Sequence, residues 1–368
     1  MAGKLVIATG ISGCGRKETF LPAFDDMCSI SGKKLKIYNV GDMIPRWAWE
    51  NAREELPSKT ILFVHKQSMN LALAGVFKDI LNSLEQDLKE FDVVLINLHT
   101  RFLWWKGSIY VPVRNEIFIA NLIKSGFGPD MFICFIDNAE DILKRLKDKE
   151  QWKGENLSEK DLWLWQNEEV NNTKSFILPL GKKINFFVMP VRQPPETLYH
   201  LTFEPWRPFV YIQMPLSHIK AGELKKVVWL IGELRKFTVI FDPMTIETGI
   251  VEREALDKAD SDAEILVRHT QTGYRDTEWF IPQVDICLAY YVKLVLTLGM
   301  VDETATAAGL GKQTWAIFPS DASPFLPFRV PPERIFKNPE ECLAAFKAYA
   351  EELEKIYKEQ NGEAQSAT

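Results

Sequence analysis

The chain has 368 residues, of which 46% are hydrophobic, 26% charged and 12% aromatic, so it is globular and long enough for two domains. Its net charge of -6 excludes a broad electrostatic affinity for nucleic acid or an anionic membrane, although a local cluster of donors can still bind a small anion. No apolar run reaches the ~18–20 residues of a membrane span and no signal peptide is recognisable, so we expect a cytoplasmic protein.

The first predicted strand, Lys4–Thr9, runs directly into a glycine-rich turn. Gly10 and Gly15 have the G-x-x-x-x-G spacing, and Arg16 follows at the position where such loops usually carry Lys. A strand, a glycine turn and a helix together aim backbone N–H groups at a phosphate. The alternative is a turn that needs glycine only for positive φ. We predict a nucleotide or phosphate site that includes Gly10, Gly13, Cys14, Gly15, Arg16 and Lys17.

The first half alternates strand-like and helix-like segments, as a parallel α/β sheet requires. The predicted strands are Lys4–Thr9, Lys36–Asn39, Thr60–Val64, Val93–Asn97, Met131–Ile136 and Asn185–Met189. The predicted helices include Leu71–Leu88, Arg114–Ser125 and Ala139–Lys147.

A charged run from Lys147 to Asn172 follows, and Ser158 has the pattern of a helix cap within it. The run is either a solvated helix pair or a lid that closes over a ligand. A lid would bring four basic side chains over the ligand, those of Lys144, Arg145, Lys147 and Lys149.

Prolines interrupt regular structure from Val191 to Pro208, which predicts a linker. The α/β alternation then resumes in a second, smaller unit. Its predicted elements are Phe209–Gln213, Ala221–Arg235, Thr238–Phe241, Tyr274–Ile281, Ile286–Tyr290, Glu303–Leu310, Thr314–Phe318 and Pro339–Gln360. The predicted organisation is therefore a domain at 1–192, a linker at 193–208, a second domain at 209–360 and a disordered tail at 361–368. Five widely spaced cysteines without a C-x-x-C pair predict reduced thiols and no metal site.

Polar residues follow two predicted strands of the first domain, at the edge where the glycine loop also opens. These are Asp42 in Asn-Val-Gly-Asp and the segment Asn97-Leu98-His99-Thr100-Arg101. Residues 4–190 resemble the archaeal type of adenylate kinase in the order of these motifs, the Pro-Asp at 129–130, Ile-Leu-Lys-Arg-Leu at 142–146 and the charged run. The resemblance implies a P-loop kinase-like parallel sheet that binds ATP or another nucleotide, with Asp42, Asn97, His99, Arg101 and Arg145 in the site.

Three positions depart from this family. Arg16 replaces Lys, Lys17 replaces the Ser or Thr that holds Mg²⁺, and Asn97 replaces a strand-end Asp. The last two changes remove oxygen ligands or negative charge where Mg²⁺ would bind. Mg²⁺ stays a candidate cofactor with altered ligand positions, and rapid phosphoryl transfer is not expected.

The second domain contains three carboxylates whose order along the chain indicates a catalytic site. Asp276 is predicted at the start of a helix, Asp285 beside a strand and Glu303 at the N-terminus of another helix. A carboxylate at a helix N-terminus can attack the anomeric carbon of a sugar while another acid protonates the departing base. The alternative gives Glu303 only a capping role and leaves the two Asp residues solvated.

This pattern resembles the nucleoside 2-deoxyribosyltransferase family and its nucleotide N-glycosidase relatives, over about residues 208–340. Tyr211-Ile212-Gln213-Met214-Pro215 matches the first strand and turn, Val284-Asp285 replaces the usual Ala-Asp, and Gly299 to Lys312 matches the Gly-x-x-x-Glu helix. The resemblance implies a flavodoxin-like, Rossmann-type domain with Glu303 as nucleophile, and Asp276 and Asp285 in the site. A homodimer is the oligomeric state that it suggests.

Three functions remain open at this point. The chain is an enzyme that cleaves or exchanges an N-glycosidic bond and also binds a nucleotide, a nucleotide or nucleoside kinase, or a nucleotide sensor without turnover. The intact carboxylates favour the first. In each case the partner is a small nucleotide or nucleoside.

Overall fold

The computed structural model describes residues 3–104, 109–112, 115–177, 180, 184–246, 262–295, 297–320 and 326–366. Contacts within the chain divide it into two units, Met1–Pro195 and Glu196–Thr368. Both are α/β units built on a five-stranded sheet in which every pairing is parallel, so the predicted fold class is confirmed at this level.

The first unit begins with β1 and the glycine loop. Its elements are β1 (Lys4–Gly10), η1 (Arg16–Phe20), α1 (Leu21–Ile30), β2 (Leu35–Asn39), α2 (Val40–Trp47), η2 (Ala48–Ala52), η3 (Ser58–Phe63), α3 (Lys66–Glu90), β3 (Val93–Asn97), β4 (Arg101–Trp104), β5 (Ile109–Pro112), α4 (Asn115–Lys124), β6 (Met131–Ile136), α5 (Ala139–Asp148), η4 (Glu150–Trp152), α6 (Glu159–Ser175) and β7 (Asn185–Pro190). β4 and β5 form a separate antiparallel hairpin.

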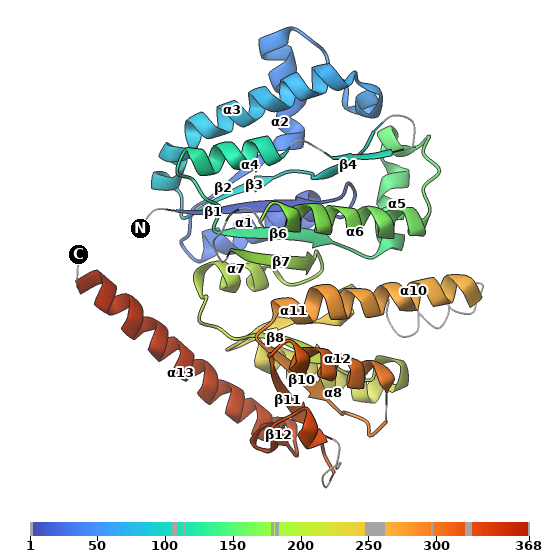
Figure 1. The fold of residues 1–368 in the computed structure, drawn as a ribbon, viewed down its shortest axis with the longest axis vertical. Coiled ribbons are helices and arrows are strands. Elements are labelled where there is room, and N and C mark those ends of the chain that lie inside the picture. Colours follow the sequence, from blue (N-terminus) through green and yellow to red (C-terminus); the bar gives the residue numbers. More distant parts are fainter. Residues whose placement is uncertain are drawn as a thin grey trace. The chain divides into compact units, whose positions relative to one another are not determined.

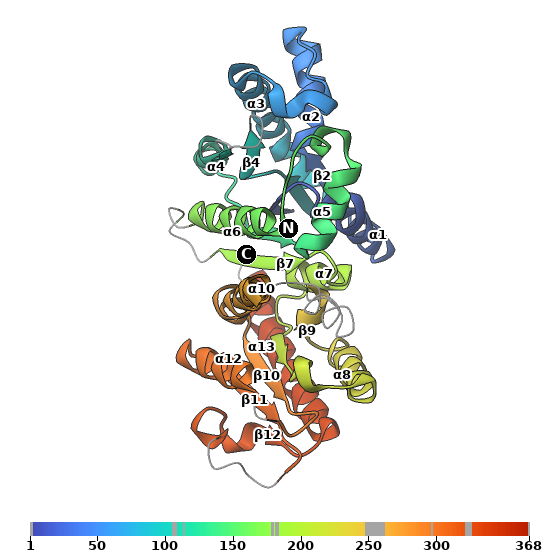
Figure 2. The same cartoon turned by 90° about the vertical axis from the view of Figure 1, so that its right-hand side faces the viewer.

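The five-stranded sheet of this unit has the order β2-β3-β1-β6-β7, which places the glycine loop at its centre. Figure 2 shows α4 and α6 on one face of the sheet and α1 and α5 on the other. The apolar faces of α3 and α4 bury Leu5, Ile7 and Ile96 in one cluster. Apolar burial on both faces explains why β1, β3 and β6 are continuous hydrophobic runs.

The second unit repeats this architecture with fewer residues (Figure 1). Its elements are α7 (Pro195–Phe203), β8 (Phe209–Gln213), η6 (Leu216–His218), α8 (Ala221–Leu234), β9 (Val239–Phe241), η7 (Pro243–Thr245), α10 (Asp262–Arg275), η8 (Asp276–Phe280), α11 (Ile281–Gln283), β10 (Ile286–Tyr290), α12 (Leu298–Gly309), β11 (Gln313–Ile317), η9 (Leu326–Phe328), η10 (Pro332–Arg334), β12 (Ile335–Phe336) and α13 (Pro339–Ser366).

The sheet of the second unit has the order β12-β11-β10-β8-β9. One face packs against α8 and α13 through an apolar cluster that contains Val210, Ile212 and Leu288. Residues between these positions, such as Tyr211 and Cys287, face the other way, because successive side chains of a strand alternate. That second face contacts α12 and lies toward η8.

Most strands were predicted within one residue, and Ser158 caps α6 as expected. Three expectations are wrong. Thr60–Val64 is not a strand, since η3, a 3-10 helix, covers Ser58–Phe63. The expected linker contains α7, and the expected disordered tail is helical as far as Ser366. All five cysteines are buried and free, and no described helix is long and apolar enough to cross a membrane.

Candidate functional site

The glycine loop after β1 has the left-handed backbone that its sequence predicts. The φ angles of Gly13 and Gly15 are 78° and 90°. A Cβ atom on Gly15 would also lie 2.4 Å from the guanidinium of Arg145, and one on Gly13 would lie 2.8 Å from Leu146. The left-handed backbone therefore favours glycine at these positions, and a larger residue would also have to displace the side chains of α5.

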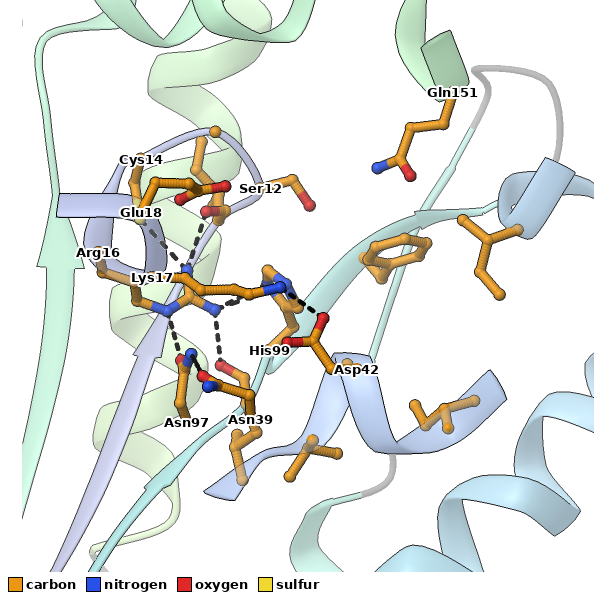
Figure 3. Close-up of a pocket in the computed structure, with 18 of the residues that line it drawn as sticks. Ser12, Cys14, Arg16, Lys17, Glu18, Asn39, Asp42, Asn97, His99 and Gln151 are labelled. Carbon is orange, nitrogen blue, oxygen red and sulfur yellow. Dashed lines mark hydrogen bonds and ion pairs between the residues drawn. The ribbon is translucent and has the colours of Figure 1, made fainter. Parts of the chain in front are cut away.

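Arg16 begins the helix after the loop, and its side chain turns back inside the loop (Figure 3). Only 5% of the residue is exposed. Its Nε donates to Oδ1 of Asn97 at 2.6 Å, and its Nη2 donates to the carbonyl of Leu98 at 3.1 Å. Its Nη1 donates to the carbonyl of Ile11 at 3.0 Å and contacts Sγ of Cys14 at 3.2 Å. The guanidinium therefore occupies the space inside the turn.

The interior of the loop is consequently lined by acceptors. The carbonyl of Ile11 accepts both from Arg16 and from the N–H of Cys14 at 3.4 Å, so it points inward. A phosphate could enter this space only by displacing the guanidinium from the carbonyl oxygens of Ile11 and Leu98 and from the sulfur atom of Cys14. The loop does not fit the phosphate chain of ATP.

The Mg²⁺ positions do not fit a metal ion either. Asn97 accepts from Arg16, and its Nδ2 donates to Oδ1 of Asn39 at 2.8 Å. Nζ of Lys17 lies 2.5 Å from Oδ1 of Asp42. Each polar group is thus held by a protein partner, and a lysine ammonium stands where a hydroxyl ligand is needed. Among the residues that the structure describes, no three His, Cys, Asp or Glu side chains gather closely enough to bind a metal.

Glu169, on α6, binds backbone N–H groups at the start of the loop and after β3. This role was not predicted from the sequence. The residue is fully buried. Its Oε1 accepts the N–H groups of Gly10 at 3.0 Å and Thr100 at 2.8 Å, and its Oε2 accepts that of Arg101 at 2.6 Å. Burial raises the pKa of this carboxyl, while the hydrogen bonds and the charge of Arg16 oppose the rise. A single carboxylate thereby ties the ends of β1 and β3 together.

A sequence signal for Glu169 does exist. It follows the buried residues Leu162 and Trp165 at helical spacings of seven and four, and Thr173 continues the same stripe. We expected this run to be either a solvated helix pair or a lid, and the stripe within it shows which of its acids is internal.

A cavity of about 360 Å³ opens beside the loop. Its walls are residues of the loop, of α2 and α3 and of the segment after β3, namely Ile11, Ser12, Gly13, Cys14, Gly15, Arg16, Lys17, Glu18, Asn39, Val40, Gly41, Asp42, Ile44, Pro45, Ile61, Met69, Leu73, Asn97, Leu98, His99, Phe102, Asn115, Lys149 and Gln151. One part is polar and carries two ion pairs, Lys17 with Asp42 and, at 2.6 Å, Lys149 with Glu18.

The cavity brings together most of the residues predicted for the first domain, but not all of them. Gly10 is not part of the wall, and its N–H donates to Glu169. Arg101 pairs with Glu168 at 3.3 Å, and Arg145 pairs with the buried carboxylate of Asp137, so neither side chain forms part of the wall. The predicted lid reaches the cavity through Lys149 alone of its four basic residues.

His99 is partly buried at the cavity wall. Burial lowers the pKa of its imidazole well below the usual value, and the charge of Arg16 lowers it further. A hydrogen bond to the backbone of Gly10 opposes this shift. The imidazole is therefore neutral at pH 7.

The second unit gathers acids around a buried tyrosine. Tyr211 lies on β8 and is 1% exposed. Burial raises the pKa of its phenol well above the usual value, and the charges of Asp276 and Glu303 raise it further, together with a hydrogen bond to Asp276. The same two carboxylates raise the pKa of Cys287. Asp276 and Glu303 are therefore brought to one place, on the face of the sheet that contacts α12.

Two uncharged residues link the tyrosine region to α12, and neither was predicted. Oγ1 of Thr304 donates to Oε1 of Gln213 at 2.9 Å, and Nε2 of Gln213 contacts Sγ of Cys287 at 2.6 Å. Thr304 is the neighbour of Glu303, so this chain of contacts holds the Glu303 turn against the sheet. The buried position of Gln213 in a strand of apolar residues was the available signal.

The structure corrects the helix positions of the predicted acids. Glu303 lies in the second turn of α12, because Thr297 caps that helix and the first residue is Leu298. Asp276 is not at a helix start, since α10 runs into η8, a π-helical turn, at this residue. Glu303 is therefore not at the helix N-terminus, where the dipole would favour its ionised form, and both acids are instead defined by their closeness to Tyr211.

Asp285 lies apart from this pair. It precedes β10, is exposed, and accepts the N–H of Phe209 at 2.9 Å with its carboxylate. Asp285 therefore joins the amino ends of β8 and β10, whereas sites of parallel sheets form at the carboxyl ends.

No protein-family model and no curated protein sequence matches the chain. The fold defines it as a two-unit α/β protein, and its function has to be argued from the two sites.

Proposed function

We propose that the second unit cleaves or exchanges the N-glycosidic bond of a nucleoside or nucleotide, and that the first unit binds a nucleotide without transferring its phosphate. The convergence of Asp276 and Glu303 on Tyr211 is the observation that carries the first part. Two carboxylates close to one buried phenol are typical of sites that do acid–base or nucleophilic chemistry. The flavodoxin-like strand order also supports it, because ligands of such sheets bind beside the first and third strands, here β8 and β10.

In this mechanism Glu303 is the nucleophile. Its carboxylate attacks the anomeric carbon, the carbon–nitrogen bond breaks, and the base leaves with the bonding electrons and takes up a proton from an acidic group, for which Asp276 is the candidate. Water then attacks the same carbon, releases the sugar and restores Glu303. Another base in place of water would give exchange.

The phenol of Tyr211 positions Asp276 in this scheme. Because burial and the neighbouring carboxylates raise its pKa, the hydroxyl stays protonated and donates a hydrogen bond to Asp276. The hydrogen bond fixes the orientation of that carboxyl while it contacts the departing base.

Release of free base tests the proposal. The protein is incubated with nucleosides and with nucleoside monophosphates, ribo and 2-deoxy, and the products are separated by chromatography. We expect base from at least one substrate, and a loss of at least ~10³-fold in the Glu303→Gln variant. Asp302→Asn, at the exposed neighbouring position, is the control and should retain the rate. Equal rates in the two variants would remove Glu303 from the mechanism.

Nucleotide binding in the first unit is supported by the cavity beside the loop, which combines two lysines with an apolar wall. Phosphoryl transfer is the weaker alternative, because Arg16 fills the loop and Lys17 and Asn97 stand at the metal positions. A coupled assay with ATP, AMP and Mg²⁺ separates the two functions. Rapid formation of ADP would show that the first unit is a kinase.

A further inference from the structure

The guanidinium of Arg16 and the interior of the glycine loop are matched to each other. Four acceptors, contributed by Asn97, Ile11, Cys14 and Leu98, lie within 3.2 Å of its three nitrogen atoms. His99 adds a contact at 3.4 Å. We propose that Arg16 is a specificity-determining residue, which closes the loop to polyphosphates and restricts the neighbouring cavity to nucleotides with one phosphate group. The choice of a nucleotide as ligand rests on the proposed function.

Closure follows from the polarity of the loop. An open phosphate loop presents N–H donors to its centre. Here the carbonyls of Ile11 and Leu98 point at the centre because they bind Arg16. A terminal phosphate of ATP could enter only if the guanidinium left, and Asn97 together with these carbonyls would then lose a buried hydrogen-bond partner.

Glu169 makes rearrangement of the loop more difficult. It holds the N–H of Gly10, the first residue of the turn, and the N–H groups of Thr100 and Arg101. The two chain segments that contact Arg16 are therefore anchored to the same buried carboxylate. The loop cannot swing open without releasing one of them.

Outside the closed loop, the cavity still offers a place for one phosphate. Lys17 and Lys149 both line it, and each is paired with a carboxylate that is about half exposed, 55% for Asp42 and 49% for Glu18. Ion pairs this exposed are weak, so a dianionic phosphate can replace the carboxylates as the partner of the lysines. Figure 3 shows the side chain of Lys17 reaching Asp42, with which it forms an ion pair.

The rest of the cavity suits the non-phosphate part of the ligand. Apolar side chains line it, those of Ile44, Ile61, Met69, Leu73 and Phe102. Its volume of about 360 Å³ is at the small end of the range for small-molecule sites. A nucleoside with one phosphate fits such a space, and the loop that Arg16 fills offers no room for a longer phosphate chain.

The test compares nucleoside monophosphates with the corresponding triphosphates by isothermal titration, without metal. The protein carries Glu303→Gln, so that the second unit does not consume the ligand. We expect at least one monophosphate to bind at least tenfold more tightly than its triphosphate. In addition, Lys17→Met should weaken monophosphate binding at least tenfold, and Lys153→Met, at an exposed position outside the cavity, should not. Equal affinity for the two ligands, or no binding of either, overturns the proposal.

Variants of Arg16 test whether this residue causes the preference for monophosphates. In Arg16→Ala the loop interior is vacant, and the ratio of triphosphate to monophosphate affinity should rise at least tenfold. Arg16→Gln retains hydrogen-bond donors and serves if the alanine variant does not fold, with a smaller rise expected. An unchanged ratio in a folded variant would show that Arg16 does not set specificity. Base release by the wild-type protein is measured separately, so a failure here is distinguishable from a failure of the proposed function.

Discussion

The two units differ in how they accommodate charged side chains close to the sheet. Each has a parallel five-stranded sheet with polar groups near the carboxyl ends of its central strands. In the first unit Arg16 and Glu169 are buried with nearly every polar atom bound to backbone or amide partners. In the second, Asp276 and Glu303 carry the same charge and lie around one phenol.

Under the proposed function, this difference separates a structural site from a reactive one. Buried charges with complete sets of partners make a loop rigid and leave little capacity to bind a reacting group. Two acids near each other raise the energy of the charged state, and that perturbation is what acid–base chemistry uses. A glycine loop with the expected spacing is therefore weaker evidence of activity here than an inconspicuous pair of acids.

The largest effect on stability is expected when the charge of Glu169 is removed, and this variant tests whether the first site is structural. Glu169→Gln puts an amide NH₂ where only acceptors are tolerated, so we expect the free energy of unfolding of the first unit to fall by about 3 kcal/mol. Hydrogen exchange of peptides containing Gly10 and Thr100, followed in urea, measures the change. Glu168→Gln is the control. Its ion pair is 42% exposed at the glutamate, and its loss should cost less than about 1 kcal/mol. Equal effects would mean that Glu169 is not an anchor.

Next is the phenol of the second unit. Tyr211→Phe removes the hydrogen bond to Asp276, and we expect base release to fall about 10–100-fold, with the loss in kcat and little change in KM. Tyr290→Phe is the matched control, because Tyr290 is also buried in the sheet but belongs to the opposite, apolar face. A comparable loss in the control would attribute the effect to packing.

Asp285 provides a smaller effect that sharpens the boundary of the site. Asp285→Ala removes the acceptor of the Phe209 N–H at an exposed position, so it should lower the free energy of unfolding by about 1 kcal/mol. Base release at 25 °C should be unchanged. If its rate falls as far as in Glu303→Gln, Asp285 belongs to the mechanism after all.

The smallest predicted effect is the pH dependence that His99 contributes. Burial and Arg16 lower its pKa below the ordinary 6.5, so between the lowered pKa and pH 6.5 the unfolded chain binds the proton that the folded chain does not. The free energy of unfolding therefore falls as the pH decreases through this window, by at most about 1.4 kcal/mol per pH unit. Urea midpoints at a series of pH values should show a smaller slope in His99→Gln. Identical slopes would contradict the assignment.

Local patterns were sufficient for much of the fold. β-branched apolar runs predicted β1, β3, β6, β8 and β10 closely, because a strand buried on both faces must be apolar along its length. The segment Thr60–Val64 has the same composition, yet Ser58–Phe63 forms a 3-10 helix, so composition alone did not decide its structure. Residues 247–261, between η7 and α10, lie outside the described part of the chain.

The sites were predictable only in part. The spacing of Gly10, Gly13 and Gly15 predicted a tight turn, and the positive φ angles of all three confirm it. Residue type alone could not show that Arg16 turns into the loop, because the outcome depends on acceptors from Asn97 and Leu98, more than 80 positions away.

The residues alone thus predicted the α/β class and the order of most elements, and they singled out Asp276 and Glu303 as candidates. Only the folded chain decided which polar groups meet. Glu169 binds the N–H of Gly10, which is 159 positions away. Tyr211 meets Asp276 and Glu303, both of which are far from it in sequence. Secondary structure follows from patterns over a few neighbours, whereas the electrostatics of a buried group depend on everything packed around it.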